Sequence, residues 1–251
     1  MRSGRGPVKN ITVLIPCYNE EKGIGKVLAK LPKERLKHNN YNLHVIVIDN
    51  NSSDNTAKVA RKYGAKVIHE PKKGKGNAMR TGFASIPKNT DYVVMLDGDD
   101  TYDAGEITRM IEPLHNDFCN VVIGSRLGGK MHQGAMRAFN RAGNWFFTHI
   151  VRVYYRVNVT DVLTGYFAWT RQTIDELHPH LISDGFAIEM EMITKMAKLG
   201  HQIYSVPISY TPRSGETNLR PFYDGRRILK MFFRSLHWQP NKIGGDAGVN
   251  A

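Results

Sequence analysis

The first half of the chain repeats one pattern, in which a short apolar run is followed by a polar loop and then by an amphipathic segment. The apolar runs predict buried strands at 11–15, 44–48, 66–69 and 92–96. Apolar residues at helical spacing predict helices at 24–31, at 56–63 and from a glycine loop at 72–76 to about residue 85. This alternation indicates an α/β fold with a mostly parallel mixed sheet flanked by helices.

The second half is less regular but contains elements of the same kinds. We expect strands at 120–124 and 203–210, an amphipathic stretch at 137–157, and helices at 187–199 and 223–236. No change in composition marks a linker, so residues 1–238 are predicted to form a single domain. The last residues, 239–251, are expected to be a disordered tail.

Polar loops follow four of the segments in the first half. They lie at 16–21, 49–54, 72–76 and 97–100. In open, mostly parallel sheets, ligands bind beyond the carboxyl ends of the strands, where such loops meet. The convergence of four loops that are distant in sequence predicts one binding site at that edge of the sheet.

Two carboxylates, Asp97 and Asp99, flank Gly98 directly after a predicted strand. Oxygen ligands of this kind bind hard cations, which share their coordination with substrate phosphates. An isolated Asp-Gly-Asp is more often an acidic turn. The preceding apolar strand and the converging loops favour a site for Mg²⁺ or Mn²⁺ instead.

Two further loops carry groups suited to a nucleotide. Asp49 ends a predicted strand, where an acidic residue can accept hydrogen bonds from a ribose or a base. Lys75 lies in the glycine loop, which resembles an anion-binding helix start but lacks the spacing of a Walker sequence. Helix capping near Asp54 and a solvated lysine run are the alternative interpretations of these two loops.

Charge and cysteine content restrict the partners and the compartment. The formal net charge of +12 requires an anionic partner, which could be nucleic acid, lipid headgroups or substrate phosphates. No nucleic-acid-binding signature is present, and a basic nucleic-acid-binding module would not explain Asp97 and Asp99. Cys17 and Cys119 are too few for a disulfide framework or a zinc cluster, which suits a reducing cytosol.

Ordered motifs along nearly the whole chain resemble glycosyltransferase family 2, and within it the dolichyl-phosphate mannose synthases and related polyprenyl-phosphate sugar transferases. The motifs that carry the resemblance lie at 15–21, 48–56, 74–80, 97–99, 124–126, 161–167 and 207–213, together with the pair Glu189 and Glu191. The resemblance implies a GT-A fold, in which a single domain binds a nucleotide-sugar donor linked to UDP or GDP. It also implies inverting transfer of the sugar to a polyprenyl or dolichyl phosphate.

The resemblance further implies roles for individual residues. Asp97 and Asp99 would hold Mg²⁺ or Mn²⁺, and Asp99, Arg126 and Arg213 would take part in catalysis. The donor nucleotide would be contacted by Pro16, Tyr18, Asn19, Glu20, Asp49, Lys75, Asp97 and Gly98. The acceptor phosphate would be bound by Arg126, Arg141 and Arg213, and Arg137 joins them only through its charge and its position in the chain.

Three positions depart from the mannose synthases. Thr101 replaces a common glutamine, so metal ligands beyond the two aspartates are open. Asn218 replaces a common lysine, so a contact to the donor diphosphate would move to Arg213 or Arg220. Asn50 replaces part of an acidic pair and looks more like relatives that use uridine donors, which leaves the donor open.

The acceptor determines which chemistry the protein must supply. A phosphate monoester, with a second pKa near ~6, is already an anionic nucleophile at neutral pH and needs no general base. A soluble or glycan hydroxyl acceptor is the alternative, and it would need a carboxylate base, for which Asp100, Glu189 and Glu191 are the candidates.

Two basic amphipathic segments with aromatic side chains, at 139–157 and 223–238, favour contact with a membrane. The same pattern also packs helices onto a protein core. No apolar run approaches the ~20 residues needed to cross a bilayer. We therefore expect a cytoplasmic protein that attaches peripherally to the cytosolic face of a membrane, either through an anionic surface or through a membrane-anchoring partner protein.

Overall fold

Six strands lie at or near their predicted positions in the computed structural model, which describes residues 7–215, 217 and 219–240, whereas the strand at 167–170 was not predicted. The part of the tail predicted at 241–251 lies outside these residues. The strands are β1 (Lys9–Cys17), β2 (Tyr41–Asp49), β3 (Lys66–His69), β4 (Tyr92–Met95), β5 (Val121–Met131), β6 (Phe167–Thr170) and β7 (Ile203–Tyr210). Strand β5 extends well beyond its predicted end, because residues 130 and 131 pair with β7 after an irregularity in the ladder.

The helices follow the amphipathic segments, with additions. They are α1 (Glu21–Lys30), α2 (Lys33–His38), α3 (Thr56–Lys62), α4 (Lys75–Ala84), α5 (Ile107–His115), α6 (Ala138–Tyr155), α7 (Arg171–Leu177), α8 (Ile188–Lys198) and α9 (Pro221–His237), with short 3-10 turns at Ala104–Glu106 and His178–His180. No helix was predicted at α2, α5 or α7. These helices are only 6, 9 and 7 residues long, and α5 also contains Pro113, which is uncommon inside a helix.

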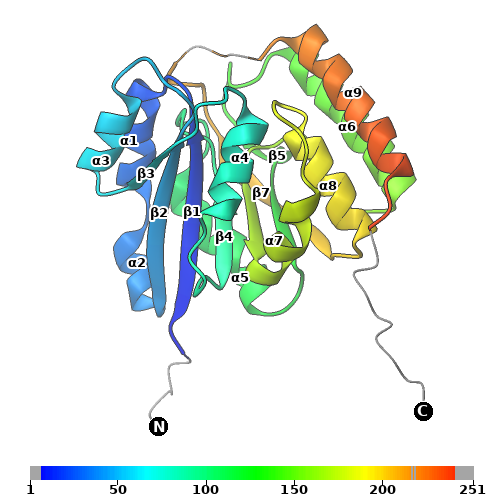
Figure 1. Cartoon of the computed structure of the whole chain (residues 1–251). Coiled ribbons are helices and arrows are strands. Elements are labelled where there is room, and N and C mark those ends of the chain that lie inside the picture. Colours follow the sequence, from blue (N-terminus) through cyan, green and yellow to red (C-terminus); the bar gives the residue numbers. More distant parts are fainter. Residues whose placement is uncertain (1–6, 216, 218, 241–251) are drawn as a thin grey trace, which may run out of the picture.

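One seven-stranded sheet has the order β3-β2-β1-β4-β6-β5-β7. Strand β6 runs antiparallel to both of its neighbours, β4 and β5, whereas every other pair is parallel. The prediction of a mostly parallel mixed sheet flanked by helices is confirmed (Figure 1). The carboxyl ends of β1, β2 and β4 therefore lie side by side at one edge of the sheet.

Both faces of the sheet are covered, and this explains why the central strands are apolar throughout. In β1, Leu14 packs with α4 on one face, while Val13 and Ile15 pack with α1 and α5 on the other. Successive side chains in a strand point to opposite faces, so each strand contributes to both hydrophobic clusters. In Figure 1, α4 crosses in front of the sheet.

Helices α6 and α9 lie side by side (Figure 1), and buried residues of both belong to the same hydrophobic cluster as Leu14. Aromatic contacts join them, with ring centroids 5.2 Å apart for Phe139 and Phe222 and 5.6 Å apart for Tyr154 and Phe232. Across the residues that the structure describes, no helix is both long and apolar enough to cross a bilayer.

Strand β6 supplies the centre of one hydrophobic cluster, and this predicts a large effect on stability. Phe167 is fully buried and stacks on Trp169 at 5.2 Å. We expect Phe167→Ala to lower the free energy of unfolding by about 3–5 kcal/mol, because a cavity remains where the ring was. Urea denaturation measures this, with Phe118→Ala as the control at an exposed ring, where a change below about 1 kcal/mol is expected. Equal effects at the two positions would contradict the packing described.

Candidate active site

The predicted loops converge at the carboxyl edge of the sheet. Asp49 is the last residue of β2, and Asp97 and Asp99 follow β4, which pairs with β1 in parallel. The loop after β1 contains Tyr18 and Glu20, and Lys75 begins α4. Pro16, near the end of β1, is buried.

Asparagine side chains join the loops to one another. Asn19 has a φ of 56°, which asparagine tolerates, and its side chain accepts a hydrogen bond from the Ser53 N–H at 2.8 Å. The buried Asn50 donates to the Lys72 carbonyl at 2.7 Å and accepts from the Gly74 N–H at 2.7 Å. An amide can donate and accept at once, so Asn50 holds the glycine loop against the end of β2.

Lys75 lies between two carboxylates. Its Nζ is 2.6 Å from Asp97 and 2.6 Å from Glu189, which is on α8. Burial acts to lower the pKa of Lys75, but Asp97 and Glu189 together raise it above its ordinary value. Lys75 is therefore a fixed positive charge at the end of β4.

Arg213 bridges two further carboxylates of the site, Glu20 and Asp99. Its guanidinium contacts Glu20 and lies 3.2 Å from an oxygen of Asp99. The Ser214 N–H also donates to the Asp99 carbonyl at 3.1 Å, which holds the loop after β7 across this edge. Thr101 donates its hydroxyl to Asp99 at 2.7 Å.

The carboxylates of the site lie close enough to disfavour one another's charge. Burial, and next the negative charge of Asp97, raise the pKa of Asp99 above its ordinary value. Burial raises the pKa of Glu20 to about 8, although Arg213 acts in the opposite direction. The edge thus concentrates negative charge that Lys75 and Arg213 only partly balance.

These residues fit a divalent cation. Asp97 and Asp99 offer hard oxygen atoms, and the raised pKa of Asp99 shows that added positive charge would be favourable there. Within the described part of the chain, no group of three or more His, Cys, Asp or Glu side chains is arranged to hold a metal. Mg²⁺ commonly takes only one or two protein carboxylates and completes its shell with phosphate oxygens and water.

Asp49 has an oxygen free for a ligand. Its side chain is buried, Oδ2 lies 3.3 Å from His69 Nδ1, and Oδ1 has no hydrogen-bond partner among the described residues. Buried polar atoms are almost always hydrogen bonded, so an acceptor without a partner indicates a place for a ligand donor. The contact of Asp49 with the nucleoside stays a prediction. Near it, the Lys73 amine lies 2.9 Å from the Tyr18 hydroxyl.

Arg126 is a buried residue with a partner of its own. Its guanidinium donates to both oxygens of Asp161 at 2.8 Å, and it lies over the Tyr210 ring. Asn144 of α6 donates to the same carboxylate at 2.6 Å. Arg126 therefore ties β5 to α6, and its contact with an acceptor phosphate stays a prediction.

The two other predicted acceptor residues lie at the start of α6. Arg137 immediately precedes the helix and Arg141 is in its first turn, and both are exposed. Neither has an ion pair with a described residue. Their role in binding the acceptor stays a prediction.

The three candidate general bases are all paired with cations. Asp100 contacts Lys30 at 2.6 Å, Glu189 contacts Lys75, and Glu191 contacts Lys195 at 2.6 Å. Glu191 is also fully buried and accepts from two backbone N–H groups. To accept a proton from a substrate hydroxyl, each of these carboxylates would first have to leave its cation.

Our sequence analysis assigned no role to Gly165 or Tyr102, yet both shape the site. A Cβ at Gly165 would collide with the carboxylate of Asp97, and the Gly165 N–H donates to the Tyr102 hydroxyl at 2.7 Å. The glycine within 161–167 was the only signal of this close approach, and the partner that requires it lies 68 positions away in sequence.

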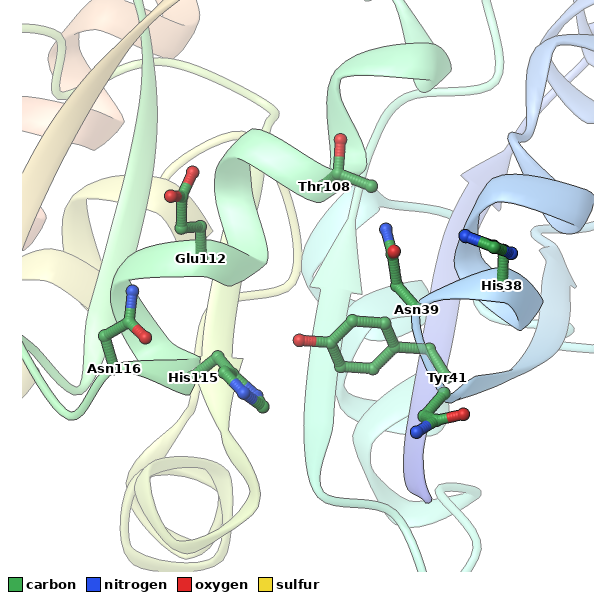
Figure 2. A pocket seen from close by; sticks show the side chains of 8 residues that line it. His38, Asn39, Tyr41, Thr108, Glu112, His115 and Asn116 are labelled. Carbon is green, nitrogen blue, oxygen red and sulfur yellow. The ribbon is translucent and has the colours of Figure 1, made fainter. Parts of the chain in front are cut away.

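A cavity of 580 Å³ lies elsewhere, at the amino end of β2. Tyr41 and His115 lie next to each other at its lining (Figure 2), with ring centroids 5.7 Å apart in an edge-to-face arrangement. It is lined by residues of α2, α5 and the start of β2, and none of the predicted site residues borders it. The cavity is therefore separate from the site.

Comparison with known proteins identifies the class of the fold. The structure superposes on glucosyl-3-phosphoglycerate synthase of Mycobacterium tuberculosis, in complex with Mn²⁺, UDP-glucose and phosphoglyceric acid, with a TM-score of 0.70 and 20% identity. The match covers 93% of this chain and 81% of that one. The fold is GT-A, as found in glycosyltransferases.

Sequence comparison defines the family. Residues 12–177 match Glycosyl transferase family 2. Glycosyltransferase AglJ of Haloferax volcanii is 37% identical over 95% of this chain and 76% of its own length. The dolichyl-phosphate hexose transferase of the same organism is 33% identical over 88% of this chain and 91% of its own. The chain belongs to glycosyl transferase family 2 and is a glycosyltransferase.

The contact between Gly165 and Asp97 gives a test that does not depend on any substrate. We expect Gly165→Ala to lower the free energy of unfolding by about 1–3 kcal/mol, because the added methyl group must displace the carboxylate. Gly143→Ala in α6 meets open space and should raise stability by up to about 1 kcal/mol. Chemical denaturation of both variants is the measurement, and a neutral Gly165→Ala would disprove the close approach.

Proposed function

We propose that the chain transfers a hexosyl group, with inversion, from a UDP- or GDP-linked sugar to a polyprenyl or dolichyl phosphate at a membrane surface. The observation that carries this proposal is the juxtaposition of Asp97 and Asp99 with Lys75 and Arg213 at the strand edge. Carboxylates for a cation beside cations for phosphate are the groups that a nucleoside diphosphate leaving group needs. The name of one similar protein, a dolichyl-phosphate hexose transferase, supports the acceptor class, and the name of a second, a hexosyltransferase, supports transfer of a hexose.

The donor nucleoside lies, in this proposal, against the end of β2, where Asp49 Oδ1 accepts a hydrogen bond from it. Pro16, near the end of β1, borders the same space, as do Tyr18, Asn19 and Glu20 in the loop after it. Mg²⁺ or Mn²⁺ held by Asp97 and Asp99 would neutralise charge on the diphosphate. Complexes of the structural neighbour with Mn²⁺ and UDP support this choice.

Transfer needs little further chemistry from the protein. An oxygen of the acceptor phosphate attacks the anomeric carbon of the sugar while the bond from that carbon to the diphosphate oxygen breaks. Lys75 and Arg213 stabilise the charge that develops on the leaving diphosphate. No proton has to be removed from a phosphate nucleophile, which agrees with the absence of a free carboxylate base among Asp100, Glu189 and Glu191.

The membrane surface in this proposal is the outer face of α6 and α9. Phe222 is 82% exposed and Trp145 is 64% exposed, with Phe146, Tyr223 and Phe233 also exposed on the two helices. Helix α6 contains no acidic residue, and the one acid of α9, Asp224, is buried. Aromatic side chains among arginines and lysines suit an interface that carries anionic lipid.

We place the enzyme on the cytosolic face of a membrane, either bound directly or through a membrane-anchoring partner protein. Cys17 and Cys119 are both free and buried, as expected in a reducing compartment.

The role of Asp99 is tested by an assay of sugar transfer. With Mn²⁺, labelled UDP-glucose, UDP-N-acetylglucosamine or GDP-mannose, and a polyprenyl phosphate, label should enter the organic phase with one donor. Asp99→Asn should reduce the rate by about 100-fold or more. The variant would hold the cation less tightly, and the negative charge that develops on the leaving diphosphate would then not be neutralised. Asp100→Asn is the matched control and should keep near-normal turnover, since Asp100 pairs with Lys30. Loss of activity in Asp100→Asn alone would instead support a hydroxyl acceptor.

Membrane attachment is tested by sedimentation with vesicles. Vesicles that contain an anionic phospholipid should bind the protein at low salt, and binding should weaken as salt increases. Arg226→Gln with Lys230→Gln should weaken binding by about 30-fold, at about 1 kcal/mol for each charge. Lys58→Gln with Arg61→Gln on α3 removes the same charge elsewhere and should have a smaller effect. Equal effects of the two pairs would show that only net charge matters.

A further inference from the structure

The glycine loop that presents Lys75 rests directly on the backbone of residues 183 and 184. Gly74 has a φ of 126°, and a Cβ there would collide with the Asp184 carbonyl. A Cβ at Gly76 would likewise collide with the Ser183 carbonyl. The Asn77 N–H, in the first turn of α4, donates to the Asp184 carbonyl at 3.2 Å. Any shift of this supporting backbone would therefore move the start of α4 and Lys75 with it.

The supporting backbone is held by a buried carboxylate that the proposed reaction does not use. Glu191 of α8 accepts from the Ile182 N–H at 3.0 Å and from the Ser183 N–H at 2.7 Å. Lys195, one turn further along α8, lies 2.6 Å from Glu191 and also donates to the His180 carbonyl. Glu191 is 0% exposed and Lys195 is 2% exposed, so neither reaches a substrate.

The same helix also contacts Lys75 directly. Glu189, two residues before Glu191, lies 2.6 Å from the Lys75 amine. Helix α8 thus fixes Lys75 in two ways. Glu189 forms an ion pair with the Lys75 amine, and Glu191 holds the backbone on which the glycine loop rests. A second pair, between Asp184 and Arg227 of α9, holds the supporting segment from its exposed side.

We propose that Glu191, together with Lys195, is a positioning residue that sets Lys75 against the leaving diphosphate. The inference rests on the proposed function, because it takes Lys75 as a contact of the donor phosphates. Two N–H groups and an ammonium converge on Glu191, and only a carboxylate accepts from all three. A glutamine would turn its own N–H₂ toward one of these donors. The requirement is therefore for the charge and shape of glutamate at this position.

The test compares binding of a nucleoside diphosphate with binding of the nucleoside alone. Isothermal titration calorimetry with Mn²⁺ gives the affinities of the full chain for UDP and uridine, and for GDP and guanosine. Glu191→Gln with Lys195→Met removes both buried charges together, which is usually tolerated better than removing one. We expect a ~10-fold loss of affinity for whichever diphosphate binds, which is typical when a residue that positions a contacting group such as Lys75 is lost. The affinity for the corresponding nucleoside should be unchanged.

A double-mutant cycle separates positioning from a general loss of stability. Lys75→Met alone should lower affinity for the diphosphate, and adding the changes at Glu191 and Lys195 should lower it little further, since all act through one contact. Lys198→Met is the matched control, because Lys198 lies on the same helix but binds carbonyls at the end of α9. It should lower the thermal unfolding temperature without changing the affinity for diphosphate.

Each outcome separates the inference from the proposed function. Equal losses for nucleoside and diphosphate, additive losses in the cycle, or no loss at all would overturn the positioning role while leaving the function intact. Failure of the unmodified chain to bind either UDP or GDP would overturn both.

Discussion

Balance of charge at the carboxyl edge of the sheet is the interaction on which the rest of the site depends. Asp99, Glu20 and Glu189 are gathered around Asp97 and Lys75, and burial, which disfavours the ionised carboxylates, raises the pKa values of Asp99, Glu20 and Glu189. Lys75 and Arg213 come from segments far apart in sequence and lie among these carboxylates. The start of α4 and the loop after β7 are therefore fixed by electrostatics as well as by packing.

The neutral amides complement these ion pairs. Asn19 joins the loop after β1 to that after β2, and Asn50 joins the latter to the glycine loop. These hydrogen bonds involve no charged group, so they hold the loops in place even when an ion pair between a carboxylate and Lys75 or Arg213 is broken. Under the proposed function, a divalent cation held by Asp97 and Asp99 would supply part of the positive charge that Lys75 now supplies to Asp97, which would leave Lys75 able to contact phosphate.

The outer helices are connected to the site by contacts of their own. Asn144 on α6 binds the carboxylate of Asp161 that holds Arg126, and Arg227 on α9 pairs with Asp184 beneath the glycine loop. The two helices proposed to meet lipid are thus tied to Arg126, a proposed acceptor contact, and to the segment beneath the glycine loop. For a transferase whose acceptor lies in a membrane, such contacts orient the reacting groups with respect to the bilayer.

The sequence by itself determined the elements with strong periodicity and the residues at strand ends. Strands β3 and β7 have their predicted bounds, and Asp49, Asp97 and Asp99 lie together as expected, because parallel strands place their following loops at one edge. The family was also evident from motifs of this local kind. Local pattern carries this information because strand period and turn chemistry act over a few neighbouring residues.

Only the tertiary structure decided which side chains are partners across long separations. The antiparallel insertion of β6, the pairing of Arg126 with Asp161 and the burial of Glu191 have no local signal. The glycine at position 165 is a local signal of a close approach, but it does not identify Asp97 as the neighbour. In the sequence Glu191 was a candidate general base. Its burial follows from the packing of α8 between the sheet and α9. Ion pairs and close approaches depend on how whole elements pack, and that packing is a property of the folded chain rather than of any segment of it.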